Sequence, residues 1–315
     1  LANAPDGIRI PLMDPINWLS FWFGQVVSGP VMGWRLMMYF NLSIALWGGY
    51  GLSRELAGPR AAWVGMVGTA TAPSLAGFID FGMTESWTIG WFAVHAWMLL
   101  SLARRGGWWR GVLAGASLGA IAMSGWYHAL YGLILEILLV PALFWHYRRP
   151  SVVWQGLIGL AIAFPLWVRF QPLRGLWEGR WRAPSSEPPA GERQAWMDGL
   201  GWRELPTYGT DLANFFLPTI DAVHPAKCAY LGSVLLALIF WGLLKERRKT
   251  VFLLLLALPL LLLALGPWPT VGGKSLGVAG PAYWLVRVFE DLRGLSHWER
   301  AVGAAAPFLA AAAAV

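Results

Sequence analysis

Residues 108–149 decide the fold of this chain: WWRGVLAGASLGAIAMSGWYHALYGLILEILLVPALFWHYRR. The stretch is apolar over nearly its whole length and carries arginines near both ends. A helix needs about 20 apolar residues to cross a membrane, so this stretch is too long for one span. Small residues, Ser124 and Gly125, mark the place where the chain can turn. The stretch therefore predicts two membrane helices joined by a tight turn near 124–126.

The same alternation of apolar runs and basic clusters continues along the chain. The basic clusters are Arg54/Arg60, Arg104/Arg105/Arg110, Arg148/Arg149 and Lys245/Arg247/Arg248/Lys249. Cytoplasmic loops of membrane proteins carry an excess of Lys and Arg, so we place all four clusters on the inner side. The outer segments are then residues 1–33, 80–86, 124–128, 171–228 and 267–300.

Composition supports a membrane protein. The chain is 57% hydrophobic and 13% charged, whereas an ordinary soluble domain carries about 25% charged residues. Many of the 22 tryptophans lie near the ends of apolar runs, where their rings anchor at the membrane interface. Nearly half of the 24 Lys and Arg lie in the four basic clusters. The net charge of +7 therefore follows from topology, and we exclude nucleic acid as a partner. The single cysteine excludes an intramolecular disulfide.

Nine apolar runs are candidate membrane spans. They cover roughly residues 34–53, 61–79, 86–103, 109–124, 127–145, 151–169, 229–244, 250–266 and 301–315. We therefore expect an all-α fold, a polytopic transmembrane helix bundle with about nine spans, outer-face loops and an interfacial helix. The interfacial helix is Pro15 to Val27, which is aromatic and too short to span, so it should lie along the membrane surface.

This topology divides the chain into four regions. They are the outer segment 1–33, a first group of membrane helices at 34–170, an outer (periplasmic) loop at 171–228, and a second group of helices at 229–315 that contains the outer loop 267–300. No targeting segment precedes the outer segment 1–33. We therefore expect a further membrane span upstream of Leu1.

Two acids in the short outer loop 80–86 are candidate catalytic residues. Asp80 and Glu85 could act as a general base, or could hold a divalent metal ion at the membrane face. The loop carries no other charge, which favours a functional role. The alternative is a solvated turn in which Glu85 lies near a helix N-terminus, where an acid is favourable.

Basic residues on the outer side are candidates for substrate binding. Arg293, His297 and Arg300 precede the last apolar run, and such a group at a helix entrance suits a phosphate. Ordinary anchoring to lipid phosphates would use the same residues. His128 lies among aromatic residues at an outer turn. It could contact a lipid headgroup, a sugar or a phosphate, or it could belong to a plain interfacial aromatic cluster.

Ionisable residues inside apolar runs are also functional candidates. For Glu136, a structural hydrogen bond to a neighbouring helix is an equal alternative. We expect His95 to be a packing histidine whose hydrogen bonds are made. VGGKS at 271–275 is similar to the end of a phosphate-binding loop. However, the first glycine of that motif would fall at Trp268 and no strand precedes it, so we exclude such a loop.

Short motifs along the chain follow one another in a characteristic order. They are NAPDG (3–7), NLSIALWGGYGLSRELAGPRAAWVGMVGTATAP (41–73), FGMTESWTIGWFAV (81–94), YGTDLANFFLPTIDAVHP with CAYLGSVLLAL (208–238), LGP (265–267) and LRGLSHWER (292–300). In this order they resemble the bacterial GT-C superfamily of polytopic glycosyltransferases, in its broad branch of integral membrane proteins. The resemblance extends over most of the chain.

The resemblance implies an enzyme of the bacterial inner (cytoplasmic) membrane that transfers a sugar from a polyprenyl-phosphate donor on the outer membrane face. It implies a catalytic acid in the first outer loop, largely upstream of Leu1, that acts as general base on the acceptor hydroxyl. By position, it assigns this role to Glu85 and, with it, Asp80. It also places Arg293 and Arg300 where they would bind the donor phosphate.

Three classes of function are compatible with the sequence to different degrees. The first is a membrane glycosyltransferase-like protein whose donor is a lipid-linked sugar. The second is a non-catalytic structural subunit of a larger membrane protein complex, with a Trp-rich surface that packs against other membrane subunits. The third, a transporter, is disfavoured because the sequence shows no inverted repeat. Membrane lipid is the expected surrounding in every class.

Overall fold

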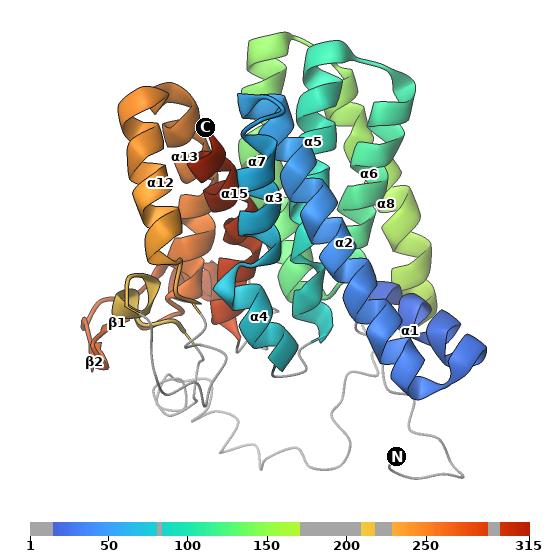
Figure 1. Ribbon diagram of the computed structural model, residues 1–315, viewed down its shortest axis with the longest axis horizontal. Coiled ribbons are helices and arrows are strands. Elements are labelled where there is room, and N and C mark those ends of the chain that lie inside the picture. Colours follow the sequence, from blue (N-terminus) through green and yellow to red (C-terminus); the bar gives the residue numbers. More distant parts are fainter. Residues whose placement is uncertain (1–14, 81–83, 171–208, 218–228, 289–296) are drawn as a thin grey trace.

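The computed structural model describes residues 15–80, 84–170, 209–217, 229–288 and 297–315, and these ranges are mostly helical (Figure 1). The prediction of an all-α fold is confirmed. The α-helices are α1 (Pro15–Ser28), α2 (Pro30–Ala57), α3 (Ala62–Ala70), α4 (Pro73–Asp80), α5 (Gly90–Arg105), α6 (Trp108–Met123), α7 (Trp126–Tyr147), α8 (Ser151–Phe170), α12 (Ser233–Lys245), α13 (Arg247–Ala264), α14 (Pro281–Val288) and α15 (Ala301–Ala314). Short 3-10 helices lie at η1 (Thr84–Ile89), η2 (Leu212–Phe215) and η5 (Trp298–Arg300), and strands β1 (Thr270–Val271) and β2 (Lys274–Ser275) form a hairpin.

The stretch 108–149 forms the predicted helical hairpin, α6 followed by α7. Gly125 lies in the turn with φ 137°, a backbone conformation that side chains disfavour. The hydroxyl of Ser124 donates to the carbonyl of Ala120 at 2.8 Å and so satisfies a carbonyl of the last turn of α6. The turn therefore falls where the small residues predicted it.

The predicted span 61–79 is wrong as a single helix. The structure divides it into α3 and α4, with a break at Thr71 and Ala72. Pro73 is the first residue of α4, and a proline disfavours the helical conformation of the residue before it. The Thr71 hydroxyl also donates to the carbonyl of Val67 at 2.8 Å and supports the end of α3. The predicted span runs through Pro73, whereas this residue begins a second helix.

Glycines let neighbouring helices approach closely. A Cβ atom on Gly115 of α6 would lie 2.7 Å from the carbonyl oxygen of Gln155 on α8. A Cβ atom on Gly49 of α2 would lie 2.5 Å from the carbonyl oxygen of Gly65 on α3. Such contacts are too short for any larger residue. Small residues at helix contacts are typical of helix packing in membranes.

Helix α15 lies at the centre of the packed helices. Every residue from Ala301 to Ala314 is buried, and α15 contacts α2, α3, α12 and α13. Its sequence, AVGAAAPFLAAAAA, has small side chains on every face, so helices can pack around all of it. Figure 1 shows α15 in dark red between the α12–α13 pair and α3. The element that precedes α15, η5, is thereby fixed at one end of the bundle.

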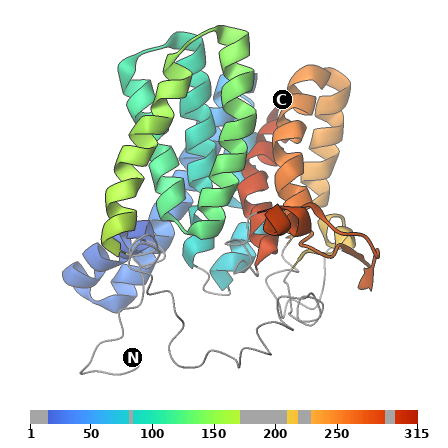
Figure 2. The same cartoon turned by 180° about the vertical axis from the view of Figure 1, so that it is seen from behind.

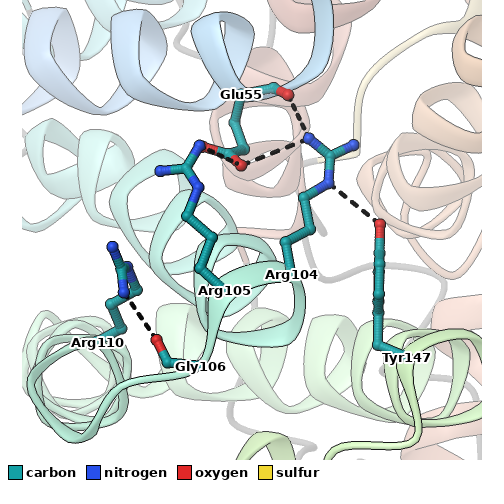
Figure 3. A network of polar contacts seen from close by, with 6 residues as sticks. All are labelled: Glu55, Arg104, Arg105, Gly106, Arg110 and Tyr147. Carbon is teal, nitrogen blue, oxygen red and sulfur yellow. Dashed lines mark hydrogen bonds and ion pairs between the residues drawn. The ribbon is translucent and has the colours of Figure 1, made fainter.

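The four basic clusters lie at one end of the bundle, called here the basic end. The turns α2–α3, α5–α6, α7–α8 and α12–α13 are all at the top of Figure 1, whereas α1, α4 and the hairpin are at the bottom; Figure 2 shows the same from behind. At the basic end the Glu55 side chain, 4% exposed, is 2.8 Å from Arg105 and 3.4 Å from Arg104. Arg104 also donates to the Tyr147 hydroxyl at 3.1 Å (Figure 3). These contacts connect the C-terminal ends of α2, α5 and α7.

Two helical segments among the described residues are long and apolar enough to cross a membrane. They are Ser86–Arg105, which is mostly buried inside the bundle, and Tyr127–Tyr147, of which about a third is buried. The helices fall close to the nine predicted apolar runs, but this test by length and hydropathy supports only two of them as spans. The number of about nine spans is therefore not confirmed and stays a prediction.

Candidate functional site

Residues from α7 and from η5 meet at the end of the bundle opposite the basic end. The Tyr127 hydroxyl accepts a hydrogen bond from the backbone N–H of His297 at 2.8 Å. The guanidinium of Arg300 lies 4.8 Å from the centre of the Tyr127 ring, a cation–π contact. The start of α7 and the start of α15 are therefore linked by residues far apart in the sequence.

A histidine and a glutamate form a pair inside this group. His297 Nδ1 lies 2.9 Å from Glu299 Oε1, and Glu299 is 1% exposed. Its second oxygen, Oε2, has no hydrogen-bond partner among the described residues. The contact with His297 therefore uses only one of the two oxygens of this buried carboxylate.

Further buried polar atoms nearby also lack hydrogen-bond partners within the described residues. They are both ring nitrogens of His128, the hydroxyl of Tyr131 and the indole nitrogen of Trp298. His128 and Tyr131 are in ring contact at 6.2 Å, and Tyr131 is close enough to Glu299 and Arg300 to interact electrostatically. We call the whole group the Arg300 cluster: Tyr127, His128, Tyr131, His297, Trp298, Glu299 and Arg300.

Orphaned polar groups of this kind need an explanation. Each buried donor or acceptor without a partner costs about 1–3 kcal/mol, and native proteins leave few of them. Bound ligands, ions and ordered water are the usual partners. Since the orphaned atoms of the Arg300 cluster come from only two elements, they fit one bound group better than unrelated packing defects.

The structure brings together three of the four predicted substrate-binding residues. His297 and Arg300 both contact Tyr127, and His128 lies close enough to Arg300 to feel its charge. The fourth, Arg293, lies outside the described residues.

The two predicted catalytic acids are placed only through their elements. Asp80 is the last residue of α4 and Glu85 belongs to η1, and both elements contact α15. Their side chains lie outside the described part of the structure. Within the described residues, no group of three or more His, Cys, Asp or Glu could hold a metal ion.

Three residues of the Arg300 cluster were not predicted from the sequence: Tyr131, Trp298 and Glu299. Tyr131 follows Tyr127 by four residues and His128 by three, so all three lie on one face of a helix. That spacing would have pointed to Tyr131. Glu299 lies in SHWER between His297 and Arg300. We treated this segment as positively charged and did not consider its acid.

A second group of polar residues lies within the bundle between α5, α6, α7 and α8. His95 Nε2 is 2.6 Å from Glu136 Oε1, and the Gln155 amide nitrogen is 3.0 and 3.1 Å from the two Glu136 oxygens. His95 Nδ1 faces the Ala114 carbonyl at 3.0 Å and the Ser117 hydroxyl at 3.3 Å. We call His95, Ser117, Glu136 and Gln155 the His95 network.

Two predictions from the sequence concern residues of the His95 network. His95 is a packing histidine with partners on both ring nitrogens, as expected. Glu136 makes the structural hydrogen bond to neighbouring helices that was one of its two alternatives. The Gln155 amide oxygen has no hydrogen-bond partner among the described residues, and the contact of His95 Nε2 is its ion pair with Glu136.

The VGGKS segment is a hairpin turn. Gly272 and Gly273 have φ 57° and 76°, as a two-residue turn between β1 and β2 requires. Asp211 accepts from the N–H groups of Gly272 at 3.0 Å and Gly273 at 2.7 Å, and from Ala213 at 2.8 Å. Although burial alone would raise it, these backbone hydrogen bonds hold the pKa of Asp211 below its ordinary value of 3.8. The exclusion of a phosphate-binding loop agrees with this geometry.

The chain was compared with protein-family models, with curated proteins and with solved structures. None of the three comparisons found a match. The function is therefore argued from the residues of the Arg300 cluster.

Proposed function

We propose that this chain is a membrane glycosyltransferase-like protein that transfers a sugar from a polyprenyl-phosphate donor on the outer membrane face. The observation that carries the proposal is the Arg300 cluster, where a buried arginine lies beside polar atoms that have no hydrogen-bond partner in the part of the chain that the structure describes. A phosphorylated sugar would supply a partner of each kind.

Arg300 is the proposed binding residue for the donor phosphate. A guanidinium forms strong, geometrically specific hydrogen bonds with phosphate oxygens. The Tyr127 ring lies against the guanidinium and helps to hold it in place. His297 and His128 are the further substrate-binding residues of the proposal.

The orphaned atoms suit a group that both donates and accepts hydrogen bonds. The Trp298 indole can only donate, the ionised Glu299 carboxylate can only accept, and Tyr131 and neutral His128 can do both. A phosphate dianion only accepts. Sugar hydroxyls do both, so the cluster suits a sugar attached to a phosphate better than phosphate alone.

The surface of the bundle supports a membrane setting for this site. Trp47 and Trp145 are each 72% exposed, and many other large apolar side chains are exposed with them. Such surfaces are rare on soluble monomers and are expected where lipid tails surround a protein. With the basic end inside, the Arg300 cluster would face the outer leaflet.

The test is donor binding and transfer by the full chain in lipid nanodiscs. The probes are radiolabelled polyprenyl-phosphate hexoses, with polyprenyl phosphate alone for comparison. Arg300→Gln should weaken donor binding by about 10- to 100-fold, the cost of a lost charged hydrogen bond. The matched control is Arg287→Gln on the exposed face of α14, which should bind as the wild type does.

Two results would overturn the proposal. One is a wild type that neither binds nor transfers any of the hexoses. The other is full donor binding by Arg300→Gln.

Orientation can be tested separately by labelling with a membrane-impermeant maleimide. Cys228 is first replaced by Ser, and then single cysteines are introduced at Arg60 at the basic end and at Lys274 in the hairpin, both exposed. We expect Lys274→Cys to react from outside intact cells and Arg60→Cys to react only after lysis. Labelling of both from the same side would contradict the topology.

A further inference from the structure

We infer that Glu299, positioned by His297, accepts the proton of the acceptor hydroxyl during sugar transfer. This inference rests on the function proposed above. It assigns the general base to the segment before α15, whereas the sequence analysis expected it at Asp80 and Glu85.

The first support is the state of the Glu299 carboxylate. One oxygen faces His297 Nδ1 at 2.9 Å, and the other has no partner among the described residues although the side chain is 1% exposed. Burial of a carboxylate is costly unless it is paired. A general base needs one oxygen fixed and one available, and Glu299 has this arrangement.

The second support is the rigid mounting of the pair. The His297 backbone is tied to Tyr127, and Glu299 lies in η5, which continues directly into the wholly buried helix α15. Catalytic groups must be held closely to their productive geometry, which packed helices achieve better than loops. The pair is therefore held from α7 and from α15.

The third support is a comparison with Asp211, another acid at this end of the bundle whose hydrogen bonds the structure describes. Both Asp211 oxygens are occupied by backbone N–H groups, and its pKa is lowered. A carboxylate stabilised in this way is a weak proton acceptor. Asp211 holds a hairpin, whereas Glu299 keeps an oxygen for the reaction.

The oxygen of the acceptor hydroxyl forms a bond to the anomeric carbon of the donor sugar, and the bond from that carbon to the phosphate oxygen breaks. The electron pair of the broken bond goes to the leaving polyprenyl phosphate, whose charge Arg300 stabilises. The hydroxyl proton goes to Glu299 Oε2. The products are the glycosylated acceptor and polyprenyl phosphate.

Glu299→Gln tests the base directly in nanodiscs, with a radiolabelled polyprenyl-phosphate hexose as donor and total membrane lipid extract as acceptor. Transfer should fall by about 100-fold or more, the contribution of a general base, while donor binding stays within about 3-fold of the wild type. The matched control is Glu246→Gln, an exposed glutamate at the basic end, which should leave both unchanged.

The outcomes separate this inference from the proposed function. A wild type without donor binding or transfer defeats the proposed function and the inference together. A wild type that transfers, with Glu299→Gln within about 10-fold of it, defeats the inference alone. Loss of binding in proportion to transfer also defeats it, because Glu299 would then be a binding residue only.

His297 is tested as a positioning residue, which also covers a Glu299→Gln variant that does not fold. His297→Ala removes the partner of Glu299 and should lower kcat by about 10- to 100-fold, the effect of a misplaced catalytic group, whereas KM should rise by only about 3-fold, the loss of one donor contact. His297→Asn keeps an N–H near the position of Nδ1 and should restore most of kcat. Equal kcat in His297→Ala and the wild type would overturn the inference.

Discussion

The His95 network and the Arg300 cluster each bury a histidine in the same bundle, and the two histidines differ in their partners. Both ring nitrogens of His95 face polar groups of other helices. Neither ring nitrogen of His128 has a hydrogen-bond partner in the described structure. The histidines are 0% and 1% exposed, so burial does not distinguish them. Their hydrogen-bond partners distinguish them. Polar groups that have partners hold helices together, whereas polar groups without partners in the described structure retain the capacity to bind a ligand.

The largest expected effect comes from breaking the satisfied network. Glu136→Ala removes the partner of buried His95 and should lower the free energy of unfolding by about 3 kcal/mol, as when one member of a buried pair is deleted. Glu136→Gln keeps an acceptor and should lose less than half as much. Both are measured by SDS titration in mixed micelles. A loss below about 1 kcal/mol for Glu136→Ala would remove the contrast between the two regions.

Two tyrosines of the Arg300 cluster differ in whether their hydroxyls have a hydrogen-bond partner among the described residues. Tyr127→Phe deletes a hydroxyl that accepts from His297 and should cost about 1 kcal/mol of stability. Tyr131→Phe deletes an orphaned hydroxyl, so stability should stay the same or rise, while donor affinity falls by about 5- to 10-fold. The same unfolding titration and the nanodisc binding assay measure both. A destabilised Tyr131→Phe with normal donor affinity would show that its hydroxyl serves the fold.

The basic end offers a satisfied network that is partly exposed to water. Glu55→Gln should lower the free energy of unfolding by about 0.5–1 kcal/mol, because the two arginines that pair with Glu55 remain partly solvated. The difference from wild type should shrink in about 1 M salt, which screens exposed charges. Unfolding titrations at low and high salt measure this effect. A difference that does not depend on salt would mean that packing, and not charge, stabilises this end.

Asp211 gives the smallest and most local effect. Its pKa is lowered by the hydrogen bonds that it accepts, so its contribution is complete above the ordinary value of 3.8 and is lost as the pH falls through the lower folded value. Amide exchange at Gly272 and Gly273 should therefore lose protection below about pH 3.8. Asp211→Asn should show the low protection at every pH. Constant protection in the wild type down to about pH 2 would contradict this role.

The fold was predictable from the sequence where its causes are local. Apolar runs and small residues placed α6, α7 and the turn at Gly125, because helix formation and turn formation depend on neighbouring residues. The break between α3 and α4 was missed because Pro73 can either end one helix or begin the next. The neighbouring residues do not distinguish the two, and in the structure both pieces pack against α15.

The candidate site was predictable only in part. His128, His297 and Arg300 were identified because polar residues beside apolar runs are unusual. Glu299 and Tyr131 were missed because their importance lies in missing partners, which only tertiary packing reveals. The pairing of His95 with Glu136 was missed for the same reason, since it requires knowledge of which helices are neighbours.

Alanine-rich α15 has a consequence for how such sequences are compared. AVGAAAPFLAAAAA is a stretch of low complexity, a type of sequence that is commonly treated as uninformative. Here it is buried at every position, and a Cβ atom on Gly68 of α3 would lie 3.0 Å from the Ala310 methyl group. Its small residues allow this close packing, and Glu299 and Arg300 directly precede the stretch. Such a stretch should therefore be kept, and not masked as uninformative, when this chain is compared with other sequences.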